Sequence, residues 1–177
     1  PVTVVSALTA AARQGVLLKG GSALEAARQL RTIALDKTGT LTTGKPALVD
    51  WQVTDAQTAS TTASTLAWQI ASRSDHPVSH AIAQGLQVDM ASSAITSAAQ
   101  DLQALPGRGV QAQLDGQNYY LVNLRWAEEN GLASAAVQAA VAQHSRQGRS
   151  VSLLANAQQV LAVFAVADTL RPEAPEA

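Results

Sequence analysis

The sequence predicts an α+β fold, in which helices cover one side of an antiparallel sheet as a two-layer sandwich over residues 47–165. One observation behind this prediction is Asp115-Gly116, a two-residue hairpin signal between the apolar segments 110–114 and 117–122. Another is a set of segments with helical periodicity, namely 55–72, 123–129 and 133–146. Two final strands are expected at 150–155 and 159–167, joined at Asn156-Ala157-Gln158.

Length and composition limit the classes of function that this chain can have. Its 177 residues, of which 47% are hydrophobic, suffice for one sizeable domain or two small ones. The net charge of -1 and the lack of a basic run argue against a nucleic-acid partner. There is no cysteine and the three histidines are scattered, so neither a disulfide framework nor a dedicated metal cage is expected.

The first elements of the chain follow from the pattern of apolar residues. Residues 1–12 are apolar and small, which is typical of a surface or core helix. Residues 47–54 partly alternate apolar with polar, as a half-exposed strand does. The helix over 55–72 is then expected to bury one face. That face consists of Leu66, Ala67, Ile70 and Trp68.

A second helix is predicted to begin at Pro77, because proline fits the first turn of a helix. His76 then becomes the N-cap, where the helix dipole favours a neutral imidazole. Residues 86–99 show no clear period and are expected to form a connecting loop. Residues 102–112 read as strand, tight glycine turn and strand.

Asp36 is the strongest candidate for a reactive group, because it ends the apolar run of residues 33–35. At the carboxyl end of a strand in an open α/β sheet, such a residue faces the ligand-binding crevice. A carboxylate can attack a phosphoryl group that is held by hydrogen-bond donors, and Lys37, Thr38 and Gly39 supply them. A phosphatase of this design needs a second carboxylate two residues further on, but Thr38 occupies that place. An aspartyl phosphate should therefore persist, which suits coupling to conformational change.

The run from Asp36 to Thr42, DKTGTLT, resembles the phosphorylation signature of P-type ATPases. The resemblance implies that ATP phosphorylates Asp36 and that Lys37 belongs to the same catalytic run. It also implies that Asp36 and the Thr38 carbonyl bind Mg²⁺, with the remaining ligands outside this chain. The alternative for any one of these residues is an ordinary turn, in which Asp, Thr and Gly are common.

Residues 15–25, GVLLKGGSALE, resemble the segment that precedes the phosphorylation domain in heavy-metal P-type ATPases. The resemblance implies a strand over 16–19 and a helix over 23–30. Ser22 would cap that helix, and Glu25 would complete a capping box. A strand over 32–35 would deliver Asp36.

Ser74-Asp75-His76-Pro77 resembles the S(E/D)HP signature of the metal-transporting members, whose His contacts the adenine of ATP. Taken alone, such a His is more often a structural cap than a ligand. Gly107 and Gly109 match the GxG of the same family, which lines the nucleotide pocket, although alone they favour a plain turn. The resemblance thus implies an ATP pocket built from Ser74, His76, Pro77, Gly107, Gly109 and Asn123.

Two positions depart from the family pattern. Many relatives carry a Glu five residues before the His of this signature, where this chain has Ala71. A Gly usually precedes the Asn that corresponds to Asn123, where this chain has Val122, whose branched side chain is expected to narrow the pocket. Both changes predict a modest nucleotide affinity.

The resemblance divides the chain into three parts. Residues 1–46 would connect to the membrane part and begin an incomplete α/β haloacid-dehalogenase-like phosphorylation domain. Residues 47–165 would form the inserted nucleotide-binding domain, and 166–177 would return to the phosphorylation domain through Asp168-Thr169-Leu170-Arg171. No run corresponds to the family's TGD or GDGxND sequences.

We therefore expect a monomeric fragment that binds ATP with Mg²⁺ without turning it over. Its partners would be ATP and the rest of the parent pump, and the parent would lie in a bacterial inner membrane with this segment in the cytoplasm. No apolar run approaches the ~20 residues that cross a bilayer.

Three functions remain open from the sequence. The first is the ATP-binding and phosphoryl-acceptor part of a heavy-metal exporter, for Zn²⁺, Cd²⁺ or Pb²⁺ by likeness of SDHPVSHAI, with Cu⁺ as the alternative. The second is an isolated nucleotide-binding or regulatory module whose DKTGT run is vestigial. The third is a soluble phosphohydrolase of the wider haloacid-dehalogenase-like class, against which Thr38 argues.

Overall fold

The computed structural model describes residues 2–27, 29–86 and 98–174, and for Lys37 and Thr38 the backbone alone. These residues divide into two compact units, Pro1–Asp36 and Lys37–Ala177. The first unit contains α1 (Val2–Arg13) and α2 (Gly21–Ala27). α2 packs closely on α1, since a Cβ on Gly21 would lie 2.7 Å from Cγ1 of Val4.

The two strands expected in the first unit are absent from its described residues. Residues 16–19 and 32–35 are irregular, and Ser22 lies inside α2 instead of capping it. A strand needs a neighbour for its backbone N–H and C=O groups, and no described segment of this unit pairs with these residues. Leu17, Ile33 and Leu35 are accordingly 89%, 71% and 58% exposed.

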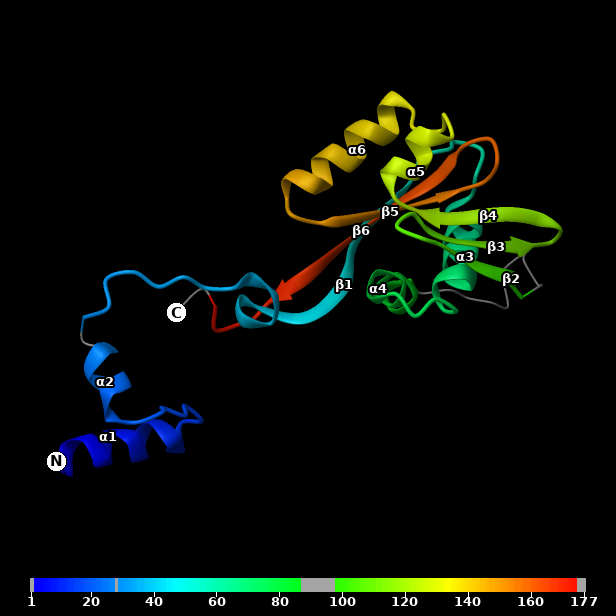
Figure 1. Ribbon diagram of the computed structural model, residues 1–177. Coiled ribbons are helices and arrows are strands. Elements are labelled where there is room, and N and C mark those ends of the chain that lie inside the picture. Colours follow the sequence, from blue (N-terminus) through cyan, green and yellow to red (C-terminus); the bar gives the residue numbers. More distant parts are fainter. Residues whose placement is uncertain (1, 28, 87–97, 175–177) are drawn as a thin grey trace. The chain divides into compact units, whose positions relative to one another are not determined.

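The second unit is built on one antiparallel sheet in the order β1-β6-β5-β4-β3-β2, which confirms the predicted α+β class (Figure 1). The strands are β1 (Thr42–Val53), β2 (Gln100–Leu105), β3 (Gly109–Leu114), β4 (Gln117–Val122), β5 (Ser150–Ala155) and β6 (Val160–Leu170). The helices are α3 (Ser60–Ala71), α4 (Pro77–Gly85), α5 (Leu124–Glu129) and α6 (Ala135–Arg146). A short π-helix, Lys37–Leu41, precedes β1.

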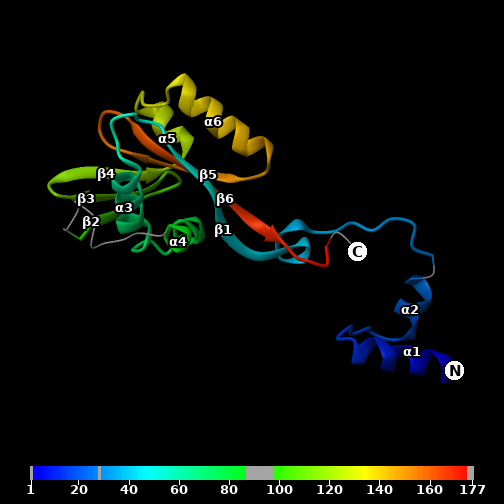
Figure 2. The same ribbon diagram turned by 180° about the vertical axis from the view of Figure 1, so that it is seen from behind.

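The helices cover both faces of the sheet, so the expected two-layer arrangement is corrected to three layers (Figures 1 and 2). Leu121, Leu154 and Phe164 pack with α3 and α4 in one core. Their neighbours Val122 and Leu153 pack with α5 and α6 in the other. Because successive side chains of a strand point to opposite faces, buried residues next to each other in sequence require a helical layer on each side.

The predicted elements of this unit are largely confirmed. Asp115 and Gly116 have φ values of 49° and 77°, as a type I′ turn requires, and Leu114 pairs with Gln117. α3 begins at Ser60 instead of residue 55, because the Asp55 carboxylate accepts hydrogen bonds from Gln57 N and Thr58 Oγ1 and forms a turn. Of the loop expected over 86–99, residues 87–97 lie outside the described residues.

β1 begins earlier than the sequence pattern indicates. It pairs with β6 from Thr42, opposite Leu170, to Val53, opposite Ala162, with an irregularity in register between Thr42 and Pro46. These two strands form the ribbon that joins the π-helix to the rest of the sheet (Figure 1).

Candidate functional site

A cavity of about 840 Å³ lies between the α3–α4 connection, the β2–β3 turn and strands β3, β4 and β5. This volume is in the range of ~300–1,000 Å³ that is usual for small-molecule sites. Five of the six residues predicted for the nucleotide pocket line it: Ser74, His76, Gly107, Gly109 and Asn123. The sixth, Pro77, begins α4 beside the cavity. The fold therefore brings together residues that are distant in sequence.

His76 is the N-cap of α4, as predicted. Its Nδ1 accepts a hydrogen bond from Val78 N at 3.2 Å, so the hydrogen of a neutral imidazole is on Nε2. Ser74 is buried and its Oγ accepts a hydrogen bond from His76 N at 3.4 Å, which holds the residue at the start of the helix. The exposed ring can thus offer a flat face and one N–H donor to a ligand.

Asn123 connects the β2–β3 turn to α5. Its Oδ1 accepts from Trp126 N at 3.0 Å and caps α5, while its Nδ2 donates to Gly107 O at 2.9 Å. Its backbone N also donates to Arg108 O at 2.8 Å. Asn123 therefore fixes the shape of the cavity wall.

Glycine stands at two positions of the β2–β3 turn for different physical reasons. A Cβ on Gly109, with φ of 141°, would lie 2.2 Å from Leu121 O, so the close approach of β4 requires glycine there. Gly107 has φ of 66° and open space around its Cα. A ligand could therefore approach the backbone closely at Gly107, whereas neighbouring backbone crowds Gly109.

The floor of the cavity comes from residues that the sequence interpretation missed. Val110 and Leu121 pair across β3 and β4 and contribute to an apolar floor, and Ser152 of β5 also lines the cavity. Val110 and Leu121 pack on the α3/α4 core. The period-two alternation of these strands was the signal that could have identified them, once the buried face was known.

The two departures from the family pattern have clear places in the structure. Ala71 is fully buried in the α3/α4 core. Val122 borders the cavity, but its side chain is 1% exposed and packs with Val137 and Val163 in the other core. The expectation that this side chain narrows the pocket is therefore wrong, because its position in β4 turns it toward the opposite face.

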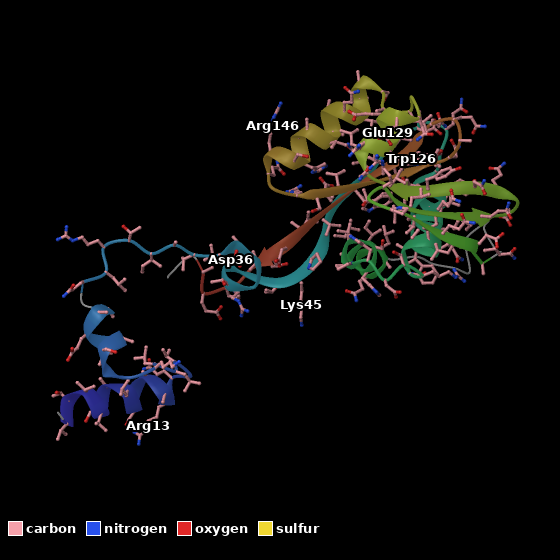
Figure 3. The ribbon with its side chains drawn as sticks, viewed as in Figure 1. Arg13, Asp36, Lys45, Trp126, Glu129 and Arg146 are labelled. Atoms are coloured by element: carbon pink, nitrogen blue, oxygen red, sulfur yellow. The ribbon has the colours of Figure 1, made fainter. Side chains whose placement is uncertain are left out.

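Arg108, which stands between the two glycines, is held by Glu129 of α5. Its Nε and Nη2 donate to the two carboxylate oxygens at 2.8 and 2.7 Å, and Arg125 Nε adds a bond of 3.1 Å. The hydrogen bond from Arg108 lowers the pKa of Glu129, and the same bond raises that of Arg108. Figure 3 shows Glu129 on α5 with Trp126, whose ring packs against that of Tyr120 in a tilted arrangement, with 4.5 Å between the ring centroids and 31° between the ring planes.

The candidate phosphoryl acceptor lies at the boundary of the two units. Asp36 is the last residue of the first unit and is exposed, while Lys37 and Thr38 begin the π-helix of the second. Within the described part of the chain, no group of three or more His, Asp or Glu side chains could hold a metal ion. A nucleotide-borne Mg²⁺ needs only one or two protein carboxylates, which is the donor set that Asp36 offers.

The C-terminal end of β6 holds the π-helix in place. Thr42 is 1% exposed, and its Oγ1 donates to Asp168 Oδ2 at 2.5 Å and accepts from Gly39 N at 3.2 Å. Arg171 donates from Nη2 to Gly39 O and from Nε to Thr42 O, both at 3.2 Å. Hydrogen bonds between residues 126 to 132 positions apart thus hold the backbone that follows Asp36.

Comparison with known proteins defines the class to which this fold and site belong. The model of the haloacid dehalogenase-like hydrolases matches residues 30–177, and the chain belongs to this family. Its relatives within this family include metal-transporting P-type ATPases. The chain is 34% identical over 173 residues to a probable cadmium-transporting ATPase of Staphylococcus aureus, covering 97% of this chain and 24% of the relative. It is also 34% identical over 178 residues to a probable copper-importing P-type ATPase A of Enterococcus hirae, covering 100% of this chain and 23% of the relative.

Solved structures agree with this assignment. A zinc-transporting PIB-type ATPase in the E2.Pi state matches with a TM-score of 0.76 and 31% identity, over 97% of this chain and 27% of that chain. The N-domain of HMA6, a copper-transporting P-type ATPase, shares the fold with a TM-score of 0.54 and 19% identity, over 70% of this chain and 99% of that domain. The chain spans about a quarter of the length of the curated relatives it matches. None of the helices in the described residues has the length and apolarity needed to span a bilayer.

Proposed function

We propose that this chain is the ATP-binding and phosphoryl-acceptor part of a heavy-metal-exporting P-type ATPase. The observation that carries the proposal is the cavity lined by Ser74, His76, Gly107, Gly109 and Asn123, which joins the SDHP and GxG segments in one site. The DKTGTLT run supplies Asp36 as acceptor. The nucleotide-binding domain would span residues 47–165, with parts of the phosphorylation domain at 1–46 and 166–177.

The proposed reaction is a transfer of the γ-phosphoryl group from ATP to Asp36. A carboxylate oxygen of Asp36 forms a bond to phosphorus as the bond to the bridging oxygen of ADP breaks, so no proton needs to move at the carboxylate. Mg²⁺ bound by Asp36 and the Thr38 carbonyl would reduce the negative charge at the phosphate. The Gly39 and Thr42 bonds to Arg171 would fix the loop backbone during this step.

Nucleotide binding can be tested directly on this chain. Titration with ATP, followed by two-dimensional ¹H–¹⁵N NMR, should shift the resonances of His76, Gly107 and Asn123, which line the cavity. Resonances of β1 residues outside the cavity serve as the internal control. An unchanged spectrum at millimolar ATP would remove the nucleotide pocket from the proposal.

The acceptor role belongs to the intact parent protein. Asp36→Asn should abolish a hydroxylamine-sensitive phosphoenzyme formed from ATP and leave nucleotide binding in place. Lys45→Gln, an exposed change on β1, is the matched control. A phosphoenzyme that persisted in Asp36→Asn would move the nucleophile to another residue.

We further propose Zn²⁺, Cd²⁺ or Pb²⁺ as cargo, with Cu⁺ as the alternative, and a cytoplasmic position for this segment beneath a bacterial inner membrane. The likeness of SDHPVSHAI to the Zn²⁺/Cd²⁺/Pb²⁺ exporters supports the first choice. Stimulation of ATPase activity of the parent by each ion, with uptake into inside-out vesicles, would test both the ion and the direction. Stimulation by Cu⁺ alone would select the alternative.

The second candidate function is a nucleotide-binding or regulatory module. One observation favours it: every residue of the cavity lies in the unit Lys37–Ala177, so binding does not require Asp36. Phosphoenzyme formation by the parent separates the two candidates, because a regulatory module would bind ATP and form none.

A further inference from the structure

The charged side chains around the cavity differ in whether they form ion pairs within the protein. Arg73, Asp75 and Arg108 line it. Arg108 is neutralised by the two-bond contact with Glu129. Within the described residues, no ion pair involves Arg73 or Asp75. Arg73 is therefore the guanidinium of this wall that has no carboxylate partner in the described structure.

Arg73 is also held in position from behind. Its Nη1 donates to both acceptors of Gln69, the backbone oxygen at 3.1 Å and Oε1 at 2.8 Å. Gln69 is 4% exposed, so this anchor belongs to the packed part of α3. A guanidinium has five N–H donors, and these bonds leave Nε and Nη2 for a ligand. An orientation fixed before binding lowers the entropy lost on binding.

We propose that Arg73 binds the polyphosphate of the nucleotide while the base lies over the apolar floor of Val110 and Leu121. The inference rests on the proposed nucleotide site and adds to it the residue that distinguishes a nucleotide from a nucleoside. The planar fork of donors matches two phosphate oxygens, which an ammonium group does not. Asp75, on the same wall, opposes the phosphate charge and limits the affinity.

The test compares ligands that differ in their phosphates. The full chain and its Arg73→Gln variant are titrated with ATP, ADP and adenosine, and binding is followed by NMR. Arg73→Gln should lower the affinity for ATP by roughly tenfold or more, which is the effect of one charge-assisted hydrogen-bonded contact. The affinity for adenosine should not change. Arg125→Gln is the matched control, because Arg125 also bonds an acceptor four residues away but lies outside the cavity lining.

Two more variants make the result independent of folding effects. Arg73→Lys keeps the charge without the fork and should recover only part of the ATP affinity. Asp75→Asn should raise ATP affinity and leave adenosine unchanged. If Arg73→Gln lowered the affinities for ATP and adenosine equally, or left the affinity for ATP unchanged, the role of Arg73 would be overturned while the cavity remained a nucleotide site. Absence of ATP binding in the unchanged chain would instead overturn the site itself, and this inference with it.

Discussion

His76 caps a helix and also lines the cavity. Nδ1 caps α4 through Val78 N, which leaves the Nε2 side of the exposed ring available to the cavity. The sequence predicted the cap from Pro77, because capping is a local property of adjacent residues. The cavity beside it depends on β3 to β5 and could not be predicted in that way.

The substitution His76→Asn separates the capping role of the residue from its proposed role in binding ATP. His76→Asn should keep the cap, since asparagine is a good N-cap, but lose the ring and with it most of the ATP affinity. His76→Ala should lose both, with a fall in unfolding free energy of about 1 kcal/mol. Urea unfolding and ATP titration measure the two effects, with His80→Ala, exposed on α4, as the control. Retained ATP affinity in His76→Asn would assign the ring a structural role alone.

Glu129 makes the stability of the fold depend on pH, and the sign of this dependence follows from the direction of its pKa shift. Arg108 lowers that pKa below the ordinary value of 4.5, so the stabilising contribution is present above about pH 4.5 and is lost as pH falls through the folded-state value. Glu129→Gln should therefore be less stable than the unchanged chain near neutral pH, and the difference should disappear in acid. Urea midpoints across this range measure it, and Glu128→Gln, on the exposed neighbour, is the control. A difference that stayed constant with pH would contradict the assignment.

At the scale of elements, the β2–β3 turn depends on glycine for a non-local reason. The sequence marks Gly107 and Gly109 as a turn, but it does not say which of them faces another strand. Only the register of β3 on β4 places the Gly109 Cα against Leu121 O.

Alanine substitutions should therefore have unequal effects at the two glycines. Gly109→Ala should destabilise the chain by about 2 kcal/mol or more, because its Cβ would meet backbone that cannot move without breaking the sheet. Gly107→Ala should cost about 1 kcal/mol, from the positive φ alone. Thermal unfolding of both variants checks the order, and equal losses would contradict the crowding at Gly109.

The irregular segments of the first unit show the limit of local patterns. Residues 16–19 and 32–35 are apolar enough for strands, yet they remain unpaired in the described structure. Strand formation requires a partner, whereas a helix such as α2 satisfies its hydrogen bonds within its own segment.

At the scale of the whole molecule, the two units should be separable in binding experiments. A shortened chain, Lys37–Ala177, should bind ATP with the affinity of the full chain and unfold in one transition, because it contains the whole sheet and every cavity residue. Calorimetric titration and unfolding measure both properties. An affinity reduced tenfold or more would show that Pro1–Asp36 contributes to the site.

The sequence by itself determined the elements and the chemistry that depend on neighbouring residues. These are the Asp115-Gly116 hairpin, the cap at His76, the buried face of α3 and the DKTGTLT run that begins at Asp36. The tertiary structure alone decided that helices cover both faces of the sheet and that Val122 turns away from the cavity. It also placed Arg73 on the cavity wall, held by Gln69 and without an ion pair among the described residues. Turns and caps are fixed by bonds a few residues apart, whereas faces and cavities are fixed by which strands pair and in which register.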